Sequence, residues 1–336
     1  MRILVLGGTA FLSAEIARQA LISGHDVTCL ARGTISAPPA GATWVRADRS
    51  EGKGAYAPVD GGSDDAGWDA VIDVSRDPVQ AREALEALAG SARHWTFISS
   101  CSVYADHSVA GAGEDAQVLP PLASGTELTM DNYGEAKSAI ESWTRELAGD
   151  RAHLCRAGLI GGPGDGSDRY GYWPARFARD HDPVLVPDIP ADSTQIIDVR
   201  DLAAWVVAAA ETQVTGALNA VGEAVSFAAY LAACRELTGT KADVVAAPGE
   251  WLAAHGVNYW AGPDSLPLWL PTGHEGFSAR SNGAARAAGL RLRPWTQTLR
   301  DTLEDERRRG LGRERKAGLA AGTEQKVLAA YREQYA

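Results

Sequence analysis

The chain has 336 residues, of which 45% are hydrophobic and 22% are charged, a composition typical of a soluble globular protein with one large or two smaller domains. A formal net charge of -11 disfavours nucleic acid and anionic membrane surfaces as partners. The four cysteines are widely separated, with no C-x-x-C pair or histidine cluster, so neither a metal site nor a disulfide framework is expected. No apolar stretch approaches the ~20 residues of a membrane span. We therefore expect a cytoplasmic protein.

The first half of the chain alternates short apolar segments with helical patterns. This alternation is typical of right-handed βαβ units and a parallel sheet. A polar stretch rich in glycine and aspartate, at 51–67, indicates a surface excursion. The expected strands are 2–6, 26–30, 43–47, 70–74, 95–98 and 153–159, and the expected helices are 11–23, 79–88 and 133–147.

The regular alternation of strand and helix patterns ends after Gly161. A turn cluster at 161–166 precedes a region that holds six of the ten tryptophans, and a strand at 196–199 is followed by a helix at 202–210, for which Asp201 is a plausible N-cap. Near the C-terminus, the basic residues at 307–316 interleave with acidic ones and indicate a solvated helix face. The prediction is an α/β fold, a Rossmann-type doubly wound parallel sheet with a smaller C-terminal substrate-binding domain. The sheet domain would span 1–160, joined by 195–212, and the substrate-binding part 161–194 and 213–336.

A turn suited to phosphate lies between the first expected strand and helix. A helix N-terminus offers free amides and a positive dipole end to a pyrophosphate. The dinucleotide fingerprint places glycine at three positions of this turn, and here they are Gly7, Ala10 and Ser13. The two replacements are small, so the turn predicts a dinucleotide site. Its candidate contacts are Gly7, Thr9, Ala10, Phe11 and Leu12.

The residue at the end of the second strand distinguishes the two nicotinamide cofactors. An acidic residue there holds the ribose 2′-hydroxyl of NAD, whereas this chain has Arg32, which suits a 2′-phosphate. NADP(H) is therefore favoured over NAD(H). Asp48 and Arg49 are expected near the adenine end of the cofactor, and Val74 and Ser75 along its middle.

Tyr133 and Lys137 lie four residues apart on one helix face. A lysine beside a phenol lowers the phenol's pKa from ~10 towards neutrality, as a general acid/base requires. Upstream, the apolar strand at 95–98 runs into the hydroxyl-rich segment Ser99-Ser100-Cys101-Ser102. Together with the phosphate turn, these features predict a nicotinamide-dependent enzyme.

This combination of motifs resembles the extended short-chain dehydrogenase/reductase superfamily, the NAD-dependent epimerase/dehydratase group, over almost the whole chain. The segments 158–176 and 268–271 look like a branch of actinobacterial reductases. The resemblance implies that Tyr133 is the acid/base and that Lys137 tunes it and binds the nicotinamide ribose. Ser100 would hydrogen-bond the substrate oxygen, with Ser102 as the competing candidate and Ser99 as the weaker one. The backbone at Ala157 and Gly158 would fix the carboxamide.

Three departures from the superfamily pattern bear on the substrate. Leu159 replaces an asparagine that holds the substrate in sugar-nucleotide enzymes, and Thr194 replaces an arginine that grips the diphosphate. The acidic pair of the 4,6-dehydratases is replaced by Cys101-Ser102. A diphosphate without a cationic clamp is poorly held, which argues against a nucleotide sugar and against a dehydratase.

We therefore expect an NADPH-dependent reductase of a carbonyl or an iminium/carbinolamine group on a bulky small molecule in secondary metabolism. The alternatives are an epimerase with tightly bound NAD and a non-catalytic NAD(P)-sensing protein. A homodimer through the helix at 133–147 is possible. Aromatic rings at 170–173 could form a pocket wall, or pack the smaller domain onto the sheet. The candidate substrate contacts are Ser102, Tyr104, Tyr170 and Trp173.

Overall fold

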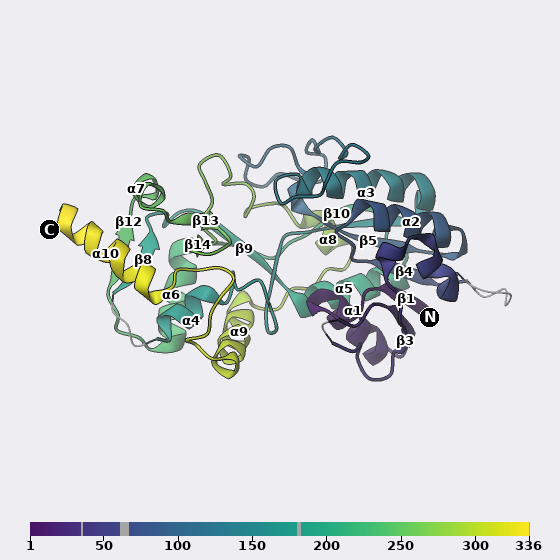
Figure 1. Ribbon diagram of the computed structural model, residues 1–336, viewed down its shortest axis with the longest axis horizontal. Coiled ribbons are helices and arrows are strands. Elements are labelled where there is room, and N and C mark those ends of the chain that lie inside the picture. Colours follow the sequence, from purple (N-terminus) through teal and green to yellow (C-terminus); the bar gives the residue numbers. More distant parts are fainter. Residues whose placement is uncertain (35, 61–66, 180–182, 336) are drawn as a thin grey trace.

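The computed structural model describes residues 1–34, 36–60, 67–179 and 183–335. Two lobes lie side by side along the longest axis of the molecule, with the sheet lobe at the N-terminal end and the smaller lobe at the C-terminal end (Figure 1). In the part of the chain described, no helix is long and apolar enough to cross a membrane.

Seven parallel strands form the sheet of the larger lobe. The strand order reverses between β1 and β4, and ligands of such sheets bind at the carboxyl ends of the strands beside this switch point. The predicted doubly wound sheet is confirmed. From one edge to the other the order is β3 (Thr43–Val45), β2 (Asp26–Leu30), β1 (Arg2–Leu6), β4 (Ala70–Asp73), β5 (Trp95–Ser100), β6 (Ala152–Ala157) and β10 (Gly216–Ala220).

Helices cover both faces of the sheet, which explains why its strands are apolar on both sides. Successive side chains of a strand point to opposite faces. Ile3 and Val5 therefore pack in one core with α1 (Phe11–Ile22) and α5 (Val199–Glu211). Their neighbours Leu4 and Leu6 pack in the other core, with α2 (Pro78–Leu88) and α3 (Tyr133–Ala148).

The edge strand β10 corrects the predicted division of the chain. Residues 216–220 were assigned to the substrate-binding part, but they pair in parallel with β6 and complete the sheet. The helix α8 (Gly283–Ala287) contributes Ala285 to the same core as α1 and α5. After residue 212 the chain therefore returns to the sheet lobe at least twice, as β10 and as α8.

The N-cap of α5 is Asp198 rather than the expected Asp201. Its carboxylate accepts a hydrogen bond of 2.8 Å from the backbone N–H of Arg200. Asp201 lies in the first turn of the helix and accepts instead from Arg293, at 2.8 Å from Nε. An acidic residue precedes either possible start, so the sequence pattern alone did not distinguish them.

The predicted surface excursion at 51–67 is wrong for its first half. Two 3-10 helices, η1 (Arg49–Glu51) and η2 (Lys53–Val59), follow β3, and Tyr56 and Val59 from η2 are buried in the core beneath α2. Residues 61–66 of the same stretch lie outside the described residues.

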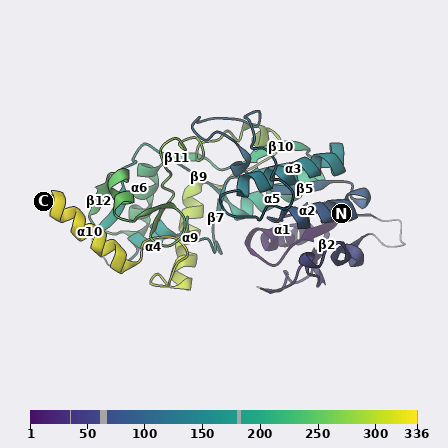
Figure 2. The same cartoon turned by 45° about the horizontal axis from the view of Figure 1, so that its top comes forward.

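The smaller lobe surrounds a core rich in aromatic rings, among them Tyr170, Trp173 and Phe227. Figure 2 shows its helices packed around short strand pairs. The strands are β7 (Leu159–Gly161), β9 (Ser193–Asp198) and β11 (Ala224–Ser226) in one sheet, β8 (Val184–Pro187) with β12 (Val244–Ala247), and β13 (Asn258–Trp260) with β14 (Ser265–Pro267). The helices are α4 (Tyr172–Phe177), α6 (Phe227–Thr238), α7 (Gly249–Ala254), α9 (Trp295–Arg309) and α10 (Ala321–Tyr335).

Candidate active site

Tyr133 and Lys137 lie in the first turns of α3, which packs against the segment that follows β5. Gly134 makes this contact possible, because a Cβ there would lie 2.2 Å from the carbonyl oxygen of Ser102. The helix start and the hydroxyl-bearing segment are therefore in direct backbone contact. The sequence brings Tyr133 to the carboxyl edge of the sheet through this glycine.

Lys137 is anchored beneath that edge. Its ammonium donates hydrogen bonds of 2.7 Å to the carbonyl oxygens of Ser75, just after β4, and Ile98, in β5. The side chain is buried, and desolvation lowers its pKa to about 7. Nζ lies 5.8 Å from the centre of the Tyr133 ring, so the two groups share one site.

Ser100 is the serine whose hydroxyl acts on the Tyr133 phenol, where it opposes the rise in the phenol's pKa. Ser100 Oγ is fixed in turn by Ser102, whose backbone N–H donates to it at 3.1 Å and whose Oγ accepts from it at 3.1 Å. The Ser99 hydroxyl points elsewhere and donates to Glu141 at 2.7 Å. The geometry therefore favours Ser100 among the three serines.

The electrostatics of Tyr133 differ from the prediction. Burial raises the pKa of its phenol above the ordinary value, against the opposing effects of Arg76, Ser100 and Arg169. The expected fall of this pKa towards neutrality is wrong for the protein alone, because burial outweighs the groups that lower it. The guanidinium carbon of Arg76 lies 5.9 Å from the centre of the Tyr133 ring.

Arg76 and Arg169 are the residues of the site that sequence reasoning missed. Arg76 follows Ser75 at the carboxyl end of β4, so its position offered a signal. Arg169 comes from the loop before α4, in the smaller lobe, and only the tertiary fold brings it to Tyr133. Its guanidinium carbon lies 5.1 Å from the centre of the Trp260 ring, a cation–π contact.

The predicted phosphate turn lies between β1 and α1. Gly7 and Gly8 have φ angles of 134° and 95°, and a Cβ at Gly8 would lie 2.4 Å from Cys29 Sγ, so both positions require glycine. The N-cap residue Ala10 has no side-chain acceptor, and the first turn of α1 carries no acidic residue. Ser13 Oγ donates to the carbonyl oxygen of Ala10 at 2.8 Å and fits the packing position. The turn that contains Thr9, Phe11 and Leu12 thus suits a pyrophosphate, by the chemistry of its donors.

Arg32 and Asp48 lie together beyond the ends of β2 and β3, where the adenine end of a dinucleotide is expected. Their charged atoms are 3.7 Å apart, and the Arg32 side chain is 59% exposed. The Ser50 backbone N–H and hydroxyl hold the pKa of Asp48 below its ordinary value, with a smaller effect from Arg32. A 2′-phosphate could therefore reach Arg32, but it would compete with Asp48 for it.

The side chain of Arg49 points inward instead. It donates to Asp73 at 2.9 Å, to the hydroxyl of Tyr56 at 3.0 Å and to the carbonyl oxygen of Gln80 at 3.1 Å. This guanidinium ties the end of β4 to η2 and α2. The predicted contact of Arg49 with a cofactor would have to use its backbone.

The other predicted cofactor contacts lie along the carboxyl edge of the sheet. Val74 and Ser75 follow β4, and a Cβ at Gly7 would lie 2.9 Å from Val74 Cγ2. Ala157 ends β6, and the backbone N–H of Gly158 donates to the carbonyl oxygen of Ala220 in β10 at 3.1 Å. These positions are compatible with a nucleotide that crosses the edge from the turn after β1 to Tyr133.

Three of the predicted substrate contacts are wrong, because their side chains lie in protein cores. Tyr170 and Trp173 are 1% and 0% exposed, and Trp173 Nε1 donates to the carbonyl oxygen of Pro267 at 2.7 Å. Tyr104 is 1% exposed, and its hydroxyl donates to Asn219 at 2.6 Å. Of the two alternatives left open for the aromatic segment, packing is the one that the structure shows. Ser102 remains at the site, beside Ser100.

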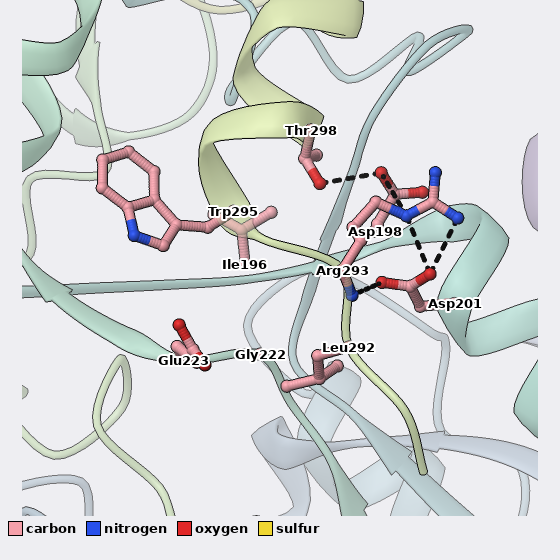
Figure 3. A pocket seen from close by; sticks show the side chains of 9 residues that line it. All are labelled: Ile196, Asp198, Asp201, Gly222, Glu223, Leu292, Arg293, Trp295 and Thr298. Atoms are coloured by element: carbon pink, nitrogen blue, oxygen red, sulfur yellow. Dashed lines mark hydrogen bonds and ion pairs between the residues drawn. The ribbon is translucent and has the colours of Figure 1, made fainter.

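A separate pocket lies at the junction of the lobes, between β9 and the start of α9 (Figure 3). Its two aspartates already have partners: Thr298 Oγ1 donates to Asp198 at 2.8 Å, and Arg293 pairs with Asp201. This pocket is a structural joint between the lobes. In the described ranges, no group of three or more histidine, cysteine, aspartate or glutamate side chains could hold a metal ion. The pocket is lined by Ile196, Asp198, Asp201, Gly222, Glu223, Leu292, Arg293, Trp295 and Thr298.

Comparison with known proteins identifies the fold. No protein-family model matches the chain, and no curated protein matches its sequence. Among solved structures, a provisionally named epimerase from Burkholderia cenocepacia is 22% identical, with a TM-score of 0.70 over 91% of this chain and 98% of that one. A UDP-glucose 4-epimerase is 15% identical, with a TM-score of 0.68 over 94% and 100%. MoeE5, solved in complex with UDP-glucuronic acid and NAD, is 18% identical, with a TM-score of 0.65 over 92% and 100%.

The chain has the fold of these three proteins along almost its whole length. The fold expected from the resemblance to the extended short-chain dehydrogenase/reductase superfamily is thus confirmed. At identities this low the likeness extends to the fold alone, and the activity has to be argued from the site.

Proposed function

We propose that this chain is an NADP(H)-dependent oxidoreductase that reduces a carbonyl or an iminium/carbinolamine group on a bulky small molecule of secondary metabolism. The observation that carries the proposal is the meeting of Ser100, Tyr133 and Lys137 at the carboxyl edge of the sheet. The N-terminus of α1, which has no side-chain cap, lies at the same edge. The switch point between β1 and β4 lies between this helix end and the three side chains.

The roles of the three side chains follow from their contacts. A bound nicotinamide nucleotide would supply or accept the hydride. Ser100 Oγ, held by Ser102, is placed to hydrogen-bond the substrate oxygen, and Tyr133 exchanges a proton with that oxygen. Two of the three N–H groups of Lys137 donate to the carbonyl oxygens of Ser75 and Ile98, which leaves one for a ribose hydroxyl. Since the raised pKa keeps the Tyr133 phenol protonated at neutral pH, Tyr133 is suited to donate a proton, the direction a reductase needs.

A second candidate is an epimerase that keeps its cofactor bound. Its support is the fold itself, since each of the three solved structures compared above shares it and two are named epimerases. The two functions differ in how the cofactor is held. A reductase exchanges its cofactor every turnover, whereas an epimerase retains it through oxidation and re-reduction of one carbon.

The cofactor is the first thing to measure. Freshly purified protein would be denatured and any released nicotinamide identified by mass spectrometry, and the empty protein would then be titrated with NADPH and NADH. An empty site that prefers NADPH is expected. Stoichiometric NAD carried through purification would contradict the NADPH assignment and support the epimerase.

Tyr133→Phe tests the catalytic assignment. We expect carbonyl reduction to fall by about 10²–10⁴-fold, the usual contribution of a general acid/base, while NADPH affinity changes little. Ser138→Ala on the same helix is the matched control, because its buried hydroxyl donates to the carbonyl oxygen of Leu119, away from Tyr133. Turnover at the wild-type rate in Tyr133→Phe would contradict the assignment for carbonyl substrates.

A further inference from the structure

Two arginines converge on Tyr133 from different lobes. Arg76 comes from the end of β4 and is exposed, and Arg169 comes from the loop before α4 and is half-buried. The two cations interact electrostatically with each other and with the phenol. Two like charges that act on each other in this way are destabilising, and an anion between them would relieve the repulsion.

Neither guanidinium has an acidic partner among the described residues: no carboxylate oxygen lies within 4.0 Å of either. This is unlike Arg49, Arg156 and Arg176, which are paired with Asp73, Glu141 and Glu324 at 2.9, 2.8 and 2.7 Å.

Arg169 is held in place without being neutralised. Its Nε donates to Ser167 Oγ at 3.3 Å and its plane lies against Trp260. The acid that acts on it electrostatically is Asp165, but that carboxylate accepts hydrogen bonds from the backbone N–H and the hydroxyl of Ser167, at 2.8 and 2.9 Å. Among the described residues, the guanidinium Nη atoms of Arg169 have no hydrogen-bond acceptor, and they remain as donors for a ligand.

We propose that Arg76 and Arg169 together bind an anionic group of the substrate, a carboxylate or a phosphate, next to the carbon that reacts at Tyr133. This inference rests on the proposed function and narrows its substrate to anionic small molecules. Guanidinium groups bind such oxyanions through paired, charge-assisted hydrogen bonds. The anion would bridge the lobes, because one arginine belongs to each.

The placement differs from a diphosphate clamp. The position where a sugar-nucleotide enzyme carries its clamp is Thr194, which is uncharged and donates to the carbonyl oxygen of Val225 in β11. The cationic pair lies instead beside the phenol. A charge recognised there belongs within a few bonds of the reacting carbon, as in a 2-oxo acid.

The cofactor also carries phosphates, so the test has to separate the two sources. The protein loaded with NADP⁺ would be titrated by calorimetry with benzoylformate and with its neutral methyl ester. Under these conditions neither probe is reduced, so binding is measured without turnover. The variants are Arg76→Gln, Arg169→Gln and Arg169→Lys. The control is Arg93→Gln, whose side chain is 78% exposed just before β5, at the opposite edge of the sheet.

We expect benzoylformate to bind the wild-type protein at least about tenfold more tightly than the ester, the size of one charge-assisted contact. Both glutamine variants should lose this preference, Arg169→Lys should retain part of it, and Arg93→Gln should behave as wild type. The affinity for NADP⁺ should stay within about twofold in all of them.

Equal binding of acid and ester by the wild-type protein would overturn the proposal. So would a loss of NADP⁺ affinity in the two glutamine variants, which would assign the arginines to a phosphate of the cofactor. Failure of the wild-type protein to bind either nicotinamide nucleotide would overturn the proposed function instead. Benzoylformate binding that both glutamine variants abolish would then still establish the anion site.

Discussion

Lys137 is the residue whose burial has a measurable effect on stability. Its pKa is lowered from 10.5 to about 7, chiefly by desolvation. Between these two values the unfolded chain binds a proton that the folded protein does not, so the free energy of unfolding rises with pH across this window. Below about pH 7 both states are protonated, and the cost of burying the cation is present in full.

We expect Lys137→Met to remove this rise. Urea unfolding of both proteins at about pH 6, 8 and 10 would show a difference in stability that shifts in favour of the wild type as the pH rises. Lys241→Met is the control, since that lysine is exposed and makes no ion pair among the described residues. A difference between wild type and Lys137→Met that stays constant with pH would contradict the lowered pKa.

Arg32 is the residue on which the proposed preference for NADPH rests. Arg32→Ala should weaken NADPH binding by ~1.5–3 kcal/mol, typical of a charge-assisted contact, and leave NADH binding nearly unchanged. Asp48→Asn should strengthen NADPH binding, because it frees the guanidinium from its partner 3.7 Å away. Fluorescence titration of the empty protein with both cofactors measures these changes. Equal losses for NADPH and NADH in Arg32→Ala would refute the role of Arg32.

At the scale of the element, α9 ends in a basic run that was predicted to be a solvated face. The structure bears this out for Arg307 and Arg308, which are exposed, and corrects it for Glu306 and its partners. Glu306, near the end of the helix, is 2% exposed and accepts from Arg313 at 3.1 Å and from Arg315 at 2.7 Å. Arg313 also pairs with Asp168, in the loop that carries Arg169. The basic run therefore fastens α9 and the chain after it to the loop beside the candidate site.

Glu306→Ala should accordingly lower the free energy of unfolding by about 3–5 kcal/mol, because it leaves the buried guanidinium of Arg315 without its carboxylate partner. Glu304→Ala, two residues away and exposed, should change it by less than about 0.5 kcal/mol. Chemical unfolding followed by tryptophan fluorescence would measure both. A loss of less than about 1 kcal/mol in Glu306→Ala would show that solvent reaches the pair.

How much of each element could be predicted depended on whether its pattern was local. Strands such as 2–6 were predictable because all their residues after Arg2 are apolar, as expected of a strand covered on both faces. Gly216–Ala220 was missed because it contains glycine, alanine and asparagine, and only its pairing with β6 makes it a strand. Tyr133 and Lys137 were found from their spacing. Arg169 was not, because its distance from Tyr133 exists only after the lobes have packed.

The aromatic segment 170–173 shows the opposite error, because its rings were assigned to the site and lie in the core. Rings suit both a pocket wall and a core, and the sequence does not tell which surface they meet. Here the ring of Trp173 packs against Phe227, with 5.4 Å between centroids, in the middle of the smaller lobe.

At the scale of the whole molecule, we expect the cooperativity of unfolding to depend on the joint between the lobes. Asp198 joins α5 to α9: it accepts from Thr298 at 2.8 Å and pairs at 2.7 Å with Arg200, which also pairs with Asp301 at 2.7 Å (Figure 3 shows the Thr298 contact). These groups link the sheet lobe to the smaller lobe.

Asp198→Ala should therefore lower the stability by about 2–4 kcal/mol and separate the unfolding of the two lobes. Differential scanning calorimetry should show one transition for the wild type and two for the variant. Glu223→Ala, an exposed residue that lines the same pocket, should keep the single transition. A single transition at the wild-type temperature in Asp198→Ala would mean that other contacts hold the lobes together.

The late position of β10 in the chain has a consequence for synthesis in the cell. The first six strands of the sheet leave the ribosome well before Gly216, and until then β6 exposes the unpaired edge that β10 covers in the finished protein. An open strand edge is a template for pairing with other chains. The nascent protein therefore passes through a stage in which half its length is made and one edge of its sheet is uncovered, the stage at which a chaperone would protect it most.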